Sequence, residues 1–149
     1  MLRRCKEKDL NQVLQIERIC FKHPYDYFTF LYFLMKEPEG FYVAEENGCI
    51  VGYVISSVRG SKGTIISIAV ILEFRRKGIG SKLMKESLDF LSKRVDHVEL
   101  QVKINNIEAI SFYRKFGFEE IGLIPNYYPD GEDALIMYKK IQKLKVSGE

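Results

Sequence analysis

The hydrophobic pattern changes abruptly in the middle of the chain, and this change constrains the fold more than any other feature. Residues Thr64–Leu72 are β-branched and apolar on both faces, which predicts a central buried strand. A basic turn with two glycines, Arg75–Gly80, follows, and Ser81–Leu91 then shows apolar residues on one helical face. A strand that runs through such a turn into a helix is typical of a sheet covered by helices.

The same turn is a candidate anion-binding site. The first N–H groups of a helix are unpaired and lie at the positive end of the helix dipole. Gly78 and Gly80 let an anion approach the backbone closely, and Arg75, Arg76 and Lys77 add positive charge. These features indicate a pyrophosphate cradle, with a simple exposed turn as the alternative. The spacing matches neither a Walker loop nor a dinucleotide fingerprint.

Further helices and strands are expected on both sides of this unit. Asp9, with Gln12 three residues later, indicates a helix start of the capping-box type. The following stripe at helical spacing consists of Leu10, Val13, Leu14, Ile16, Glu17 and Ile19 to Phe21. Asn47-Gly48 is a strong signal for a hairpin turn. The expected helices are residues 10–21, part of 25–35, 81–91 and 106–116, and the expected strands are 41–45, 49–58, 64–72, 97–102, 118–124 and 134–140. We therefore predict a mixed α/β fold around one sheet.

Length and composition exclude several classes of protein. The chain has 149 residues, so we expect a single domain over residues 1–149. Three cysteines without C-x-x-C spacing and two histidines predict neither a disulfide framework nor a metal site. No apolar stretch approaches the ~20 residues of a membrane helix, and no apolar segment follows the basic N-terminus as in a signal peptide. A net charge of +3 is too small to indicate a nucleic-acid partner. We expect a cytoplasmic protein in a reducing compartment, without a membrane partner.

Basic residues gather at both ends of the chain. Residues 1–8 carry four basic side chains against one acidic side chain. The segment from Lys139 to the last residue carries four lysines against one glutamate, and we expect residues 141–149 to form a basic tail. Exposed charge that aids solubility is the ordinary explanation for both clusters. A contact with the ribosome is also compatible with the tail.

Three motifs, in this order, resemble those of the GNAT acetyltransferases. Ser67-Ile68-Ala69-Val70, followed after four residues by Arg75-Arg76-Lys77-Gly78-Ile79-Gly80, is similar to the acetyl-CoA signature of the family. Asn106-x-x-Ala109-Ile110-x-Phe112-Tyr113-x-x-Phe116-Gly117-Phe118 resembles its second signature. Asn126-Tyr127-Tyr128-Pro129-Asp130-Gly131-Glu132-Asp133-Ala134 resembles a loop of the RimI-type and archaeal protein N-terminal acetyltransferases. The resemblance implies the GNAT fold: a mixed, mostly antiparallel sheet flanked by helices, with a splayed pair of strands at the acetyl-CoA site.

The resemblance also implies acetyl-CoA as cosubstrate, no metal, and a role for each matching residue. The backbone of Ile68, Ala69 and Val70 would pair with the pantetheine arm and the acetyl group. Asn106 would bind the arm of the cofactor, and Tyr113 would contact the cofactor and protonate the departing thiolate, for which a phenol is a suitable donor. A core aromatic is the alternative for Tyr113. The pyrophosphate would lie on Arg75, Arg76, Lys77, Gly78, Ile79, Gly80 and Ser81.

The catalytic base is where the sequence departs from the family pattern. The RimI-type branch often has a glutamate base where this chain has Gln101, which cannot take a proton but could hold a water or a substrate amide. Glu99 lies on the same face of the expected strand, about 7 Å away at typical strand rise. His23 and His97 are alternative bases by pKa, and a chain of bound water is a further one. A eukaryotic-type branch places a tyrosine and a histidine at positions that are Thr64 and Gln101 here, so its base arrangement is not preserved either.

Two aromatic segments match the loops that hold the peptide N-terminus in the resembling enzymes. They are His23-Pro24-Tyr25 and Tyr127-Tyr128, and tyrosines with apolar bodies and polar tips suit a peptide slot. Within the aromatic run that follows, we expect Phe28, Phe30 and Phe33 to pack in the core.

The most specific function that these features predict is acetyl transfer from acetyl-CoA to the α-amino group of a protein or peptide N-terminus, directly within a ternary complex. A lysine side chain, a polyamine or another small amine is an alternative acceptor. A regulatory module that binds acetyl-CoA without turnover is an alternative from a different class, and its support is Gln101. We expect a monomer or weak dimer, with contact to the ribosome or to a partner subunit left open.

Overall fold

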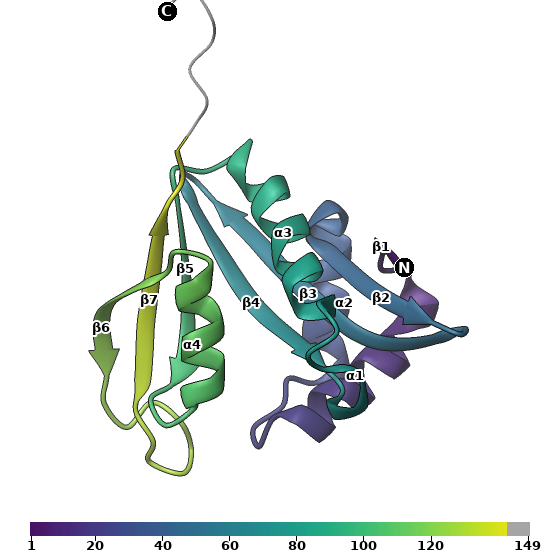
Figure 1. The fold of residues 1–149 in the computed structure, drawn as a ribbon, viewed down its shortest axis with the longest axis horizontal. Helices are drawn as coiled ribbons and strands as arrows, with labels where there is room; N and C mark the ends of the chain where they lie inside the picture. The colour runs from purple at the N-terminus through teal and green to yellow at the C-terminus, as the bar shows by residue number, and fades with distance from the viewer. Residues whose placement is uncertain (143–149) are drawn as a thin grey trace, which may run out of the picture.

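The computed structural model describes residues 1–142 as one seven-stranded sheet with helices on both faces (Figure 1). The strands are β1 (Leu2–Arg4), β2 (Phe41–Glu46), β3 (Cys49–Arg59), β4 (Lys62–Val70), β5 (His97–Lys103), β6 (Glu119–Ile124) and β7 (Ala134–Lys140). The helices are α1 (Leu10–Cys20), α2 (Tyr27–Lys36), α3 (Ile79–Ser92) and α4 (Ile107–Lys115), with short 3-10 turns η1 (Glu7–Asp9), η2 (Pro38–Gly40) and η3 (Leu72–Phe74). The predicted mixed α/β fold is confirmed.

Each predicted helix and strand is present, within a few residues of its expected bounds. Asn47 and Gly48 have positive φ angles of 52° and 80°, as a two-residue hairpin turn requires, and they join β2 to β3. Gly117, with φ 91°, follows the end of α4. The strand β1 was not predicted, because three residues are too few to show a hydrophobic period. It lies at the edge of the sheet against β2.

The order of strands in the sheet is β1-β2-β3-β4-β5-β7-β6. All neighbours are antiparallel except β4 and β5, which are parallel and are connected through α3. These two strands pair over only three residues, Lys62–Thr64 with His97–Glu99. Beyond that point they diverge, and Figure 1 shows them as the two arms of a V. The splayed pair implied by the sequence motifs is therefore present.

Two hydrophobic cores lie on opposite faces of the sheet. The helices α3 and α4 cover one face, where Leu83, Met84 and Leu91 are buried. The helices α1 and α2 lie behind β2, β3 and β4, where Leu10 and Phe30 are buried (Figure 1). Both faces of β2–β4 are therefore covered by helices.

The strand β4 is less buried than its apolar sequence predicted. Ile65 and Ala69 are buried, but Ile66 and Ile68 are only half-buried. The reason is that β4 has lost β5 as a neighbour at this level, so one edge of its middle is uncovered. The expected central position of this strand in the sheet is thus confirmed. The expectation that it is fully buried is wrong for Ile66 and Ile68.

The N-terminal basic cluster is not simply exposed charge. The Arg3 guanidinium donates to Asp9 at 2.7 and 3.0 Å and to Glu45 at 2.7 Å, which ties β1 to β2 and to the start of α1. The predicted capping box is also wrong. Asp9 precedes α1, but its side chain makes no cap bond, since it is engaged by Arg3. Gln12 instead accepts a hydrogen bond from the N–H of Ile50 at 3.0 Å.

Residue 141, the first of the expected basic tail, still packs against the sheet. Lys139 and Lys140 belong to β7, and the buried Ile141 donates its N–H to the carbonyl of Asp96 at 2.8 Å. The rest of the expected tail, from residue 143 on, lies outside the described residues. Within residues 1–142, no helix has the length and apolar character needed to cross a membrane.

Candidate active site

The candidate site starts where β4 separates from β5. In the pairing of β3 with β4, Ile55 lies opposite Ser67 and Ser56 opposite Ile65, so Ile66 is an extra residue that makes a β-bulge. The last pair between β4 and β5 is Thr64 with Glu99, just before this bulge. The backbone of residues 68–70 therefore has no strand partner on the β5 side within the described chain. The Val70 carbonyl accepts from Arg75, and the other polar groups on this side are available to a ligand that enters between the strands.

The glycine turn forms the start of α3, as expected. Gly78 is the N-cap of α3 with φ 83°, and no side chain caps the first turn of this helix. Arg76 also has a positive φ of 63°. A Cβ on Gly80 would come no nearer than 3.6 Å to the Phe112 ring, so protein packing alone leaves room for a side chain there. Because Gly80 has no side chain, the uncapped N–H groups at the start of α3 stay open to an anion.

The three basic side chains of the turn differ in their contacts. The Nε atom of Arg75 donates to the carbonyl of Val70 at 2.7 Å, and its Nη2 lies 3.5 Å from the Cys20 sulfur. Arg75 thus stabilises the end of β4. Lys77 places its ammonium 5.1 Å from the centre of the Phe74 ring. Whether these side chains also contact a pyrophosphate stays a prediction.

The helix α4 carries the two residues of the second motif. Asn106 is the N-cap of α4, and its Oδ1 accepts from the N–H of Ala109 at 3.2 Å. Tyr113 lies in the last turn of α4, with its ring in edge contact with Phe112 and Phe118. Burial, and then the phenol of Tyr128, raises the pKa of Tyr113 above its ordinary value. Tyr113 therefore holds its proton at neutral pH and can donate it.

Gln101 lies on β5, two residues beyond the last pair with β4, and its side chain is exposed. Of the alternative bases, Glu99 and His97 lie at the closed end of the V, where Glu99 is 3.7 Å from both Lys62 Nζ and His97 Nε2. His97 also stacks on Tyr138, with ring centres 5.4 Å apart. Because the strands are still joined at that end, Gln101 is nearer than either residue to the open part of the V.

The two segments predicted to hold the substrate are brought together, although they are more than 100 residues apart in the sequence. The rings of His23 and Tyr128 stack with centres 6.4 Å apart, and Tyr127 contacts Tyr128 edge to face at 5.0 Å. Burial and the Tyr127 phenol raise the pKa of Tyr25, and burial, Tyr127 and Tyr25 raise that of Tyr128. The three tyrosines therefore share one neighbourhood, and Pro24 directly precedes Tyr25 in the α1–α2 loop.

Asp130 connects these two segments, and no role was predicted for this residue from the sequence. Its Oδ2 accepts from Lys103 Nζ at 2.8 Å and from Lys22 Nζ at 3.2 Å, and it lies 3.6 Å from His23 Nε2. Lys103 also places its ammonium 5.1 Å from the centre of the Tyr128 ring. We call this set of contacts, centred on Asp130, the Asp130 clasp. It joins the α1–α2 loop, β5 and the β6–β7 loop.

Two expectations about the first helices are wrong. Phe30 is buried and Phe33 is half-buried, as predicted, but Phe28 is 75% exposed. Likewise Ile19, in the predicted apolar stripe of α1, is 76% exposed, whereas Glu17 in the same stripe is 2% exposed. The burial of Glu17 was not predicted, because the residues around it in the stripe are apolar. A charged residue at a core position of an amphipathic helix was the signal that could have found it.

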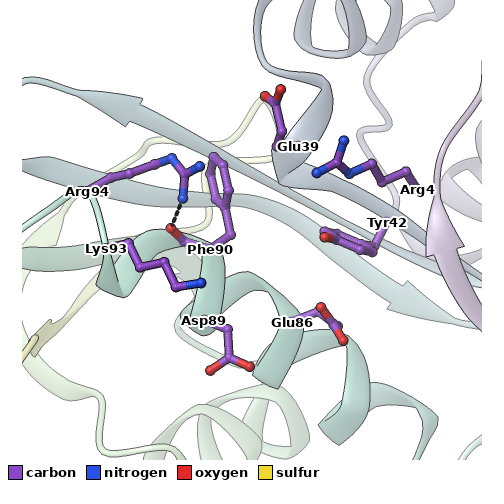
Figure 2. Close-up of a pocket in the computed structure, with 8 residues that line it drawn as sticks. All are labelled: Arg4, Glu39, Tyr42, Glu86, Asp89, Phe90, Lys93 and Arg94. Carbon is purple, nitrogen blue, oxygen red and sulfur yellow. Dashed lines mark hydrogen bonds between the residues drawn. The ribbon is translucent and has the colours of Figure 1, made fainter.

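A shallow hollow lies elsewhere, between α3, β2 and the N-terminal segment (Figure 2). Arg94 closes one side, because its Nη1 donates to the Phe90 carbonyl at 2.7 Å and its guanidinium lies over the Phe90 ring. Three basic and three acidic side chains line the hollow, which is away from the open part of the V. Its lining is Arg4, Glu39, Tyr42, Glu86, Asp89, Phe90, Lys93 and Arg94. No cluster of His, Cys, Asp or Glu in residues 1–142 could hold a metal ion.

Comparison with known proteins agrees with this architecture. The sequence model of the acetyltransferase (GNAT) family matches residues 10–118. The N-alpha-acetyltransferase of Sulfolobus acidocaldarius is 36% identical over 143 residues, which is 87% of this chain and 85% of that protein. Crystallographic Ard1 from Thermoplasma volcanium superposes with a TM-score of 0.91, at 32% identity, over 96% of this chain and 98% of the other.

A further solved structure is that of Arabidopsis thaliana Naa50 in complex with the bisubstrate analogue CoA-Ac-MVNAL. It superposes with a TM-score of 0.86, at 28% identity, over 94% of this chain and 97% of the other. The family model covers well over half of the chain, and the splayed strands, the glycine turn and the α4 tyrosine lie where the sequence motifs required. The chain belongs to the GNAT acetyltransferase family.

Proposed function

We infer that this protein is an acyltransferase that moves the acetyl group of acetyl-CoA to the α-amino group of a protein or peptide N-terminus. The observation that carries the inference is the V between β4 and β5, which has an anion cradle at one mouth and a tyrosine-lined loop pair at the other. An enzyme that joins two substrates directly needs such a site, open on both sides. Relatives named N-alpha-acetyltransferase, and the CoA–peptide analogue held by Naa50, support the same acceptor.

The residues present fit acetyl-CoA, which when bound supplies an activated acetyl group. The uncapped first turn of α3, with Gly78 in a left-handed conformation, suits a pyrophosphate. The unpaired edge of β4 at residues 68–70 suits the amide groups of the pantetheine arm, as one more strand would. Asn106 uses its Oδ1 to cap α4, which leaves its amide nitrogen as a donor to that arm.

In the transfer, a neutral amine forms a bond to the acetyl carbon while the carbon–sulfur bond breaks. Tyr113 provides the proton that the sulfur needs, because its phenol is protonated at neutral pH. The amine loses a proton to solvent in exchange, and the Tyr113 phenolate regains its proton from solvent. Gln101 cannot take the proton of the amine, so we propose that its amide holds a water that carries this proton to solvent. Backbone N–H groups of β4 beyond the bulge stabilise the negative charge that develops on the acetyl oxygen.

The peptide N-terminus lies against the surface that the loop of His23, Pro24 and Tyr25 and the loop of Tyr127 and Tyr128 form together. Stacked and edge-packed rings give a preformed slot with polar tips. Since the first residues of a peptide are flexible, rigid aromatic walls reduce the ordering that binding requires. We also propose that the protein has a single domain and is cytoplasmic. We propose that it works as a monomer or weak dimer, and sedimentation at micromolar concentration would test this oligomeric state.

The test is CoA release from acetyl-CoA against free-amine peptides with varied first residues. Polyamines and an N-blocked peptide with a free lysine serve as competing acceptors. Turnover restricted to free N-termini is the expected result. Turnover only on lysine or polyamines would overturn the acceptor and keep the enzyme. Tight binding of acetyl-CoA without turnover on any amine would favour the binding-module alternative.

A further inference from the structure

Glu17 is a buried carboxylate for which the proposed reaction has no use. It lies on α1, is 2% exposed, and its neighbours on the same helix face are apolar, among them Val13 and Leu14. No Lys, Arg or His of the described chain forms an ion pair with it. A carboxylate in such surroundings is costly unless its oxygens are well satisfied.

Three neutral donors satisfy Glu17, and they come from three different segments. Its Oε1 accepts from the hydroxyl of Tyr53 on β3 and, at 2.9 Å, from the hydroxyl of Ser67 on β4. Its Oε2 accepts from the backbone N–H of Tyr25 at 3.0 Å. The two hydroxyls also lie 3.0 Å apart. Burial and the charge of Glu17 raise the pKa of Tyr53 well above its ordinary value, so Tyr53 remains a donor.

The two ends of this network belong to opposite sides of the candidate site. Ser67 follows the β4 bulge directly and precedes the residues 68–70 whose backbone faces the V. Tyr25 is in the α1–α2 loop, beside Tyr127 and Tyr128. One carboxylate therefore joins the strand on which the acetyl group would lie to the loop that would hold the acceptor.

We propose that Glu17 is a positioning residue, which fixes the acceptor loop at Tyr25 against the acetyl-CoA strand at Ser67 and thereby presets the slot for the peptide N-terminus. This inference rests on the proposed function. A loop held before binding has less to lose in conformational entropy when the peptide arrives. Without Glu17, the peptide itself would have to order the loop, and its apparent affinity would fall while the chemistry of the bound complex stayed the same.

The experiment compares Glu17→Gln with Asp9→Asn. Asp9 is a matched control, because it is also a buried acid at α1, 3% exposed, and is held by Arg3 and the N–H of Lys6 away from the slot. A glutamine has one acceptor oxygen where Glu17 uses two. We expect Glu17→Gln to raise the KM for peptide about fivefold, with kcat and the Kd for acetyl-CoA within about twofold of wild type. Asp9→Asn should lower Tm and leave the KM for peptide unchanged.

Two outcomes would overturn the proposal. One is a lower Tm for Glu17→Gln with an unchanged KM for peptide, which is the behaviour of a purely structural residue. The other is a large fall in kcat with a shifted pH–rate profile, which would make Glu17 part of the proton path. Failure of the proposed function is separate, because it would appear in the wild type as turnover on other amines only.

Ser67→Ala is a second variant. It removes one donor and leaves the bond between Glu17 and Tyr25, so it should fold and raise the KM for peptide only about twofold.

A second measurement does not depend on turnover. Amide hydrogen exchange at Tyr25 reports the bond between Glu17 and Tyr25 directly. We expect fast exchange at Tyr25 in Glu17→Gln and slow exchange in Asp9→Asn and in the wild type. Equal exchange in all three proteins would overturn the role of Glu17 even for an enzyme without a known acceptor.

Discussion

The two sides of the V are built from different parts of the polypeptide. The acetyl-CoA side consists mainly of backbone: the uncapped start of α3, the left-handed Gly78 and the unpaired edge of β4 at residues 68–70. The acceptor side consists mainly of side chains, namely the stacked rings of His23 and Tyr128 and the Asp130 clasp. Under the proposed function, backbone groups would recognise the parts that every CoA thioester shares, whereas side chains could be exchanged to select among acceptors.

This difference predicts separable effects of substitution. Changes on the acetyl-CoA side should alter the affinity for acetyl-CoA or the chemical step, and should do so equally for every acceptor. Changes on the acceptor side should alter the KM for peptide and leave acetyl-CoA binding intact. Each of the following variants tests whether the two sides are independent in this sense.

Tyr113→Phe should have the largest effect. It removes the proposed proton donor to sulfur, and general acids contribute on the order of 100-fold or more to such steps. We expect kcat to fall about 100-fold, with the Kd for acetyl-CoA and the KM for peptide nearly unchanged. The measurement is initial-rate kinetics, together with calorimetric binding of acetyl-CoA. A rate close to that of wild type would remove Tyr113 from the chemistry and leave it as an aromatic packed against Phe118.

Gly78→Ala should weaken acetyl-CoA binding about tenfold, because an alanine at φ 83° is strained and its Cβ lies at the cradle. Gly48→Ala is the matched control. Gly48 has a similar φ of 80° and equally open space around it, but it lies in the β2–β3 turn. Both variants should lose similar stability in thermal unfolding, and only Gly78→Ala should bind acetyl-CoA more weakly. Equal affinities would argue against the glycine turn as the pyrophosphate site.

Asp130→Asn should raise the KM for peptide about fivefold without changing acetyl-CoA binding, because it loosens the clasp between the two acceptor segments. Glu120→Gln, which breaks the exposed pair with Arg114, is the control and should change neither constant. A weaker affinity for acetyl-CoA in Asp130→Asn would show that the two sides are not independent.

The clasp also has a defined pH dependence. The hydrogen bond from Lys103, followed by those from the Glu132 N–H and Lys22, holds the pKa of Asp130 below its usual range. A lowered carboxyl pKa adds stability that is present above the unfolded value of about 3.9 and is lost as the pH falls through the folded value. We therefore expect the difference in Tm between wild type and Asp130→Asn to be constant from pH 5 to 8 and to shrink only in acid.

Gln101→Ala should have the smallest effect. It removes one neutral amide that is proposed to hold a water, so kcat should fall about threefold with both substrate affinities unchanged. Glu99→Gln, on the same face of β5 but at the closed end of the V, should leave kcat as it is. A fall in kcat for Glu99→Gln, with the basic limb of the pH–rate profile lost, would instead identify Glu99 as the base.

The same difference between the two sides explains how much the sequence could predict. The acetyl-CoA side is a local structure, because the strand, turn and helix are consecutive, and the pattern from Thr64 to Leu91 therefore showed both its shape and its charge. The positions of Gly78, Tyr113 and the splayed strands followed from that pattern and the motifs. The extra residue in β4, Ile66, did not, since a bulge depends on pairing with another strand.

The acceptor side depends on contacts between distant segments, and its energetics were therefore missed. The aromatic loops were found, but Asp130 and Lys22 are 108 residues apart, and no local pattern shows that they meet. Glu17 was grouped with apolar residues and Phe28 with the core, because helical spacing fixes the face of a residue but not what covers that face. Arg3 was likewise taken for solvated charge, although it pairs with Asp9 and Glu45.

The three-residue contact between β4 and β5 also bears on how the chain acquires its fold. Residues 1–92 contain β1–β4 with α1–α3, and residues 97–140 contain β5, α4, β6 and β7, so each half of the sheet is continuous in sequence. The halves share few strand pairs, but the core beneath α3 contains buried residues of both, among them Leu83 and Leu100. We expect the first half to form first, with the second half completing that core as a late and more easily reversed event.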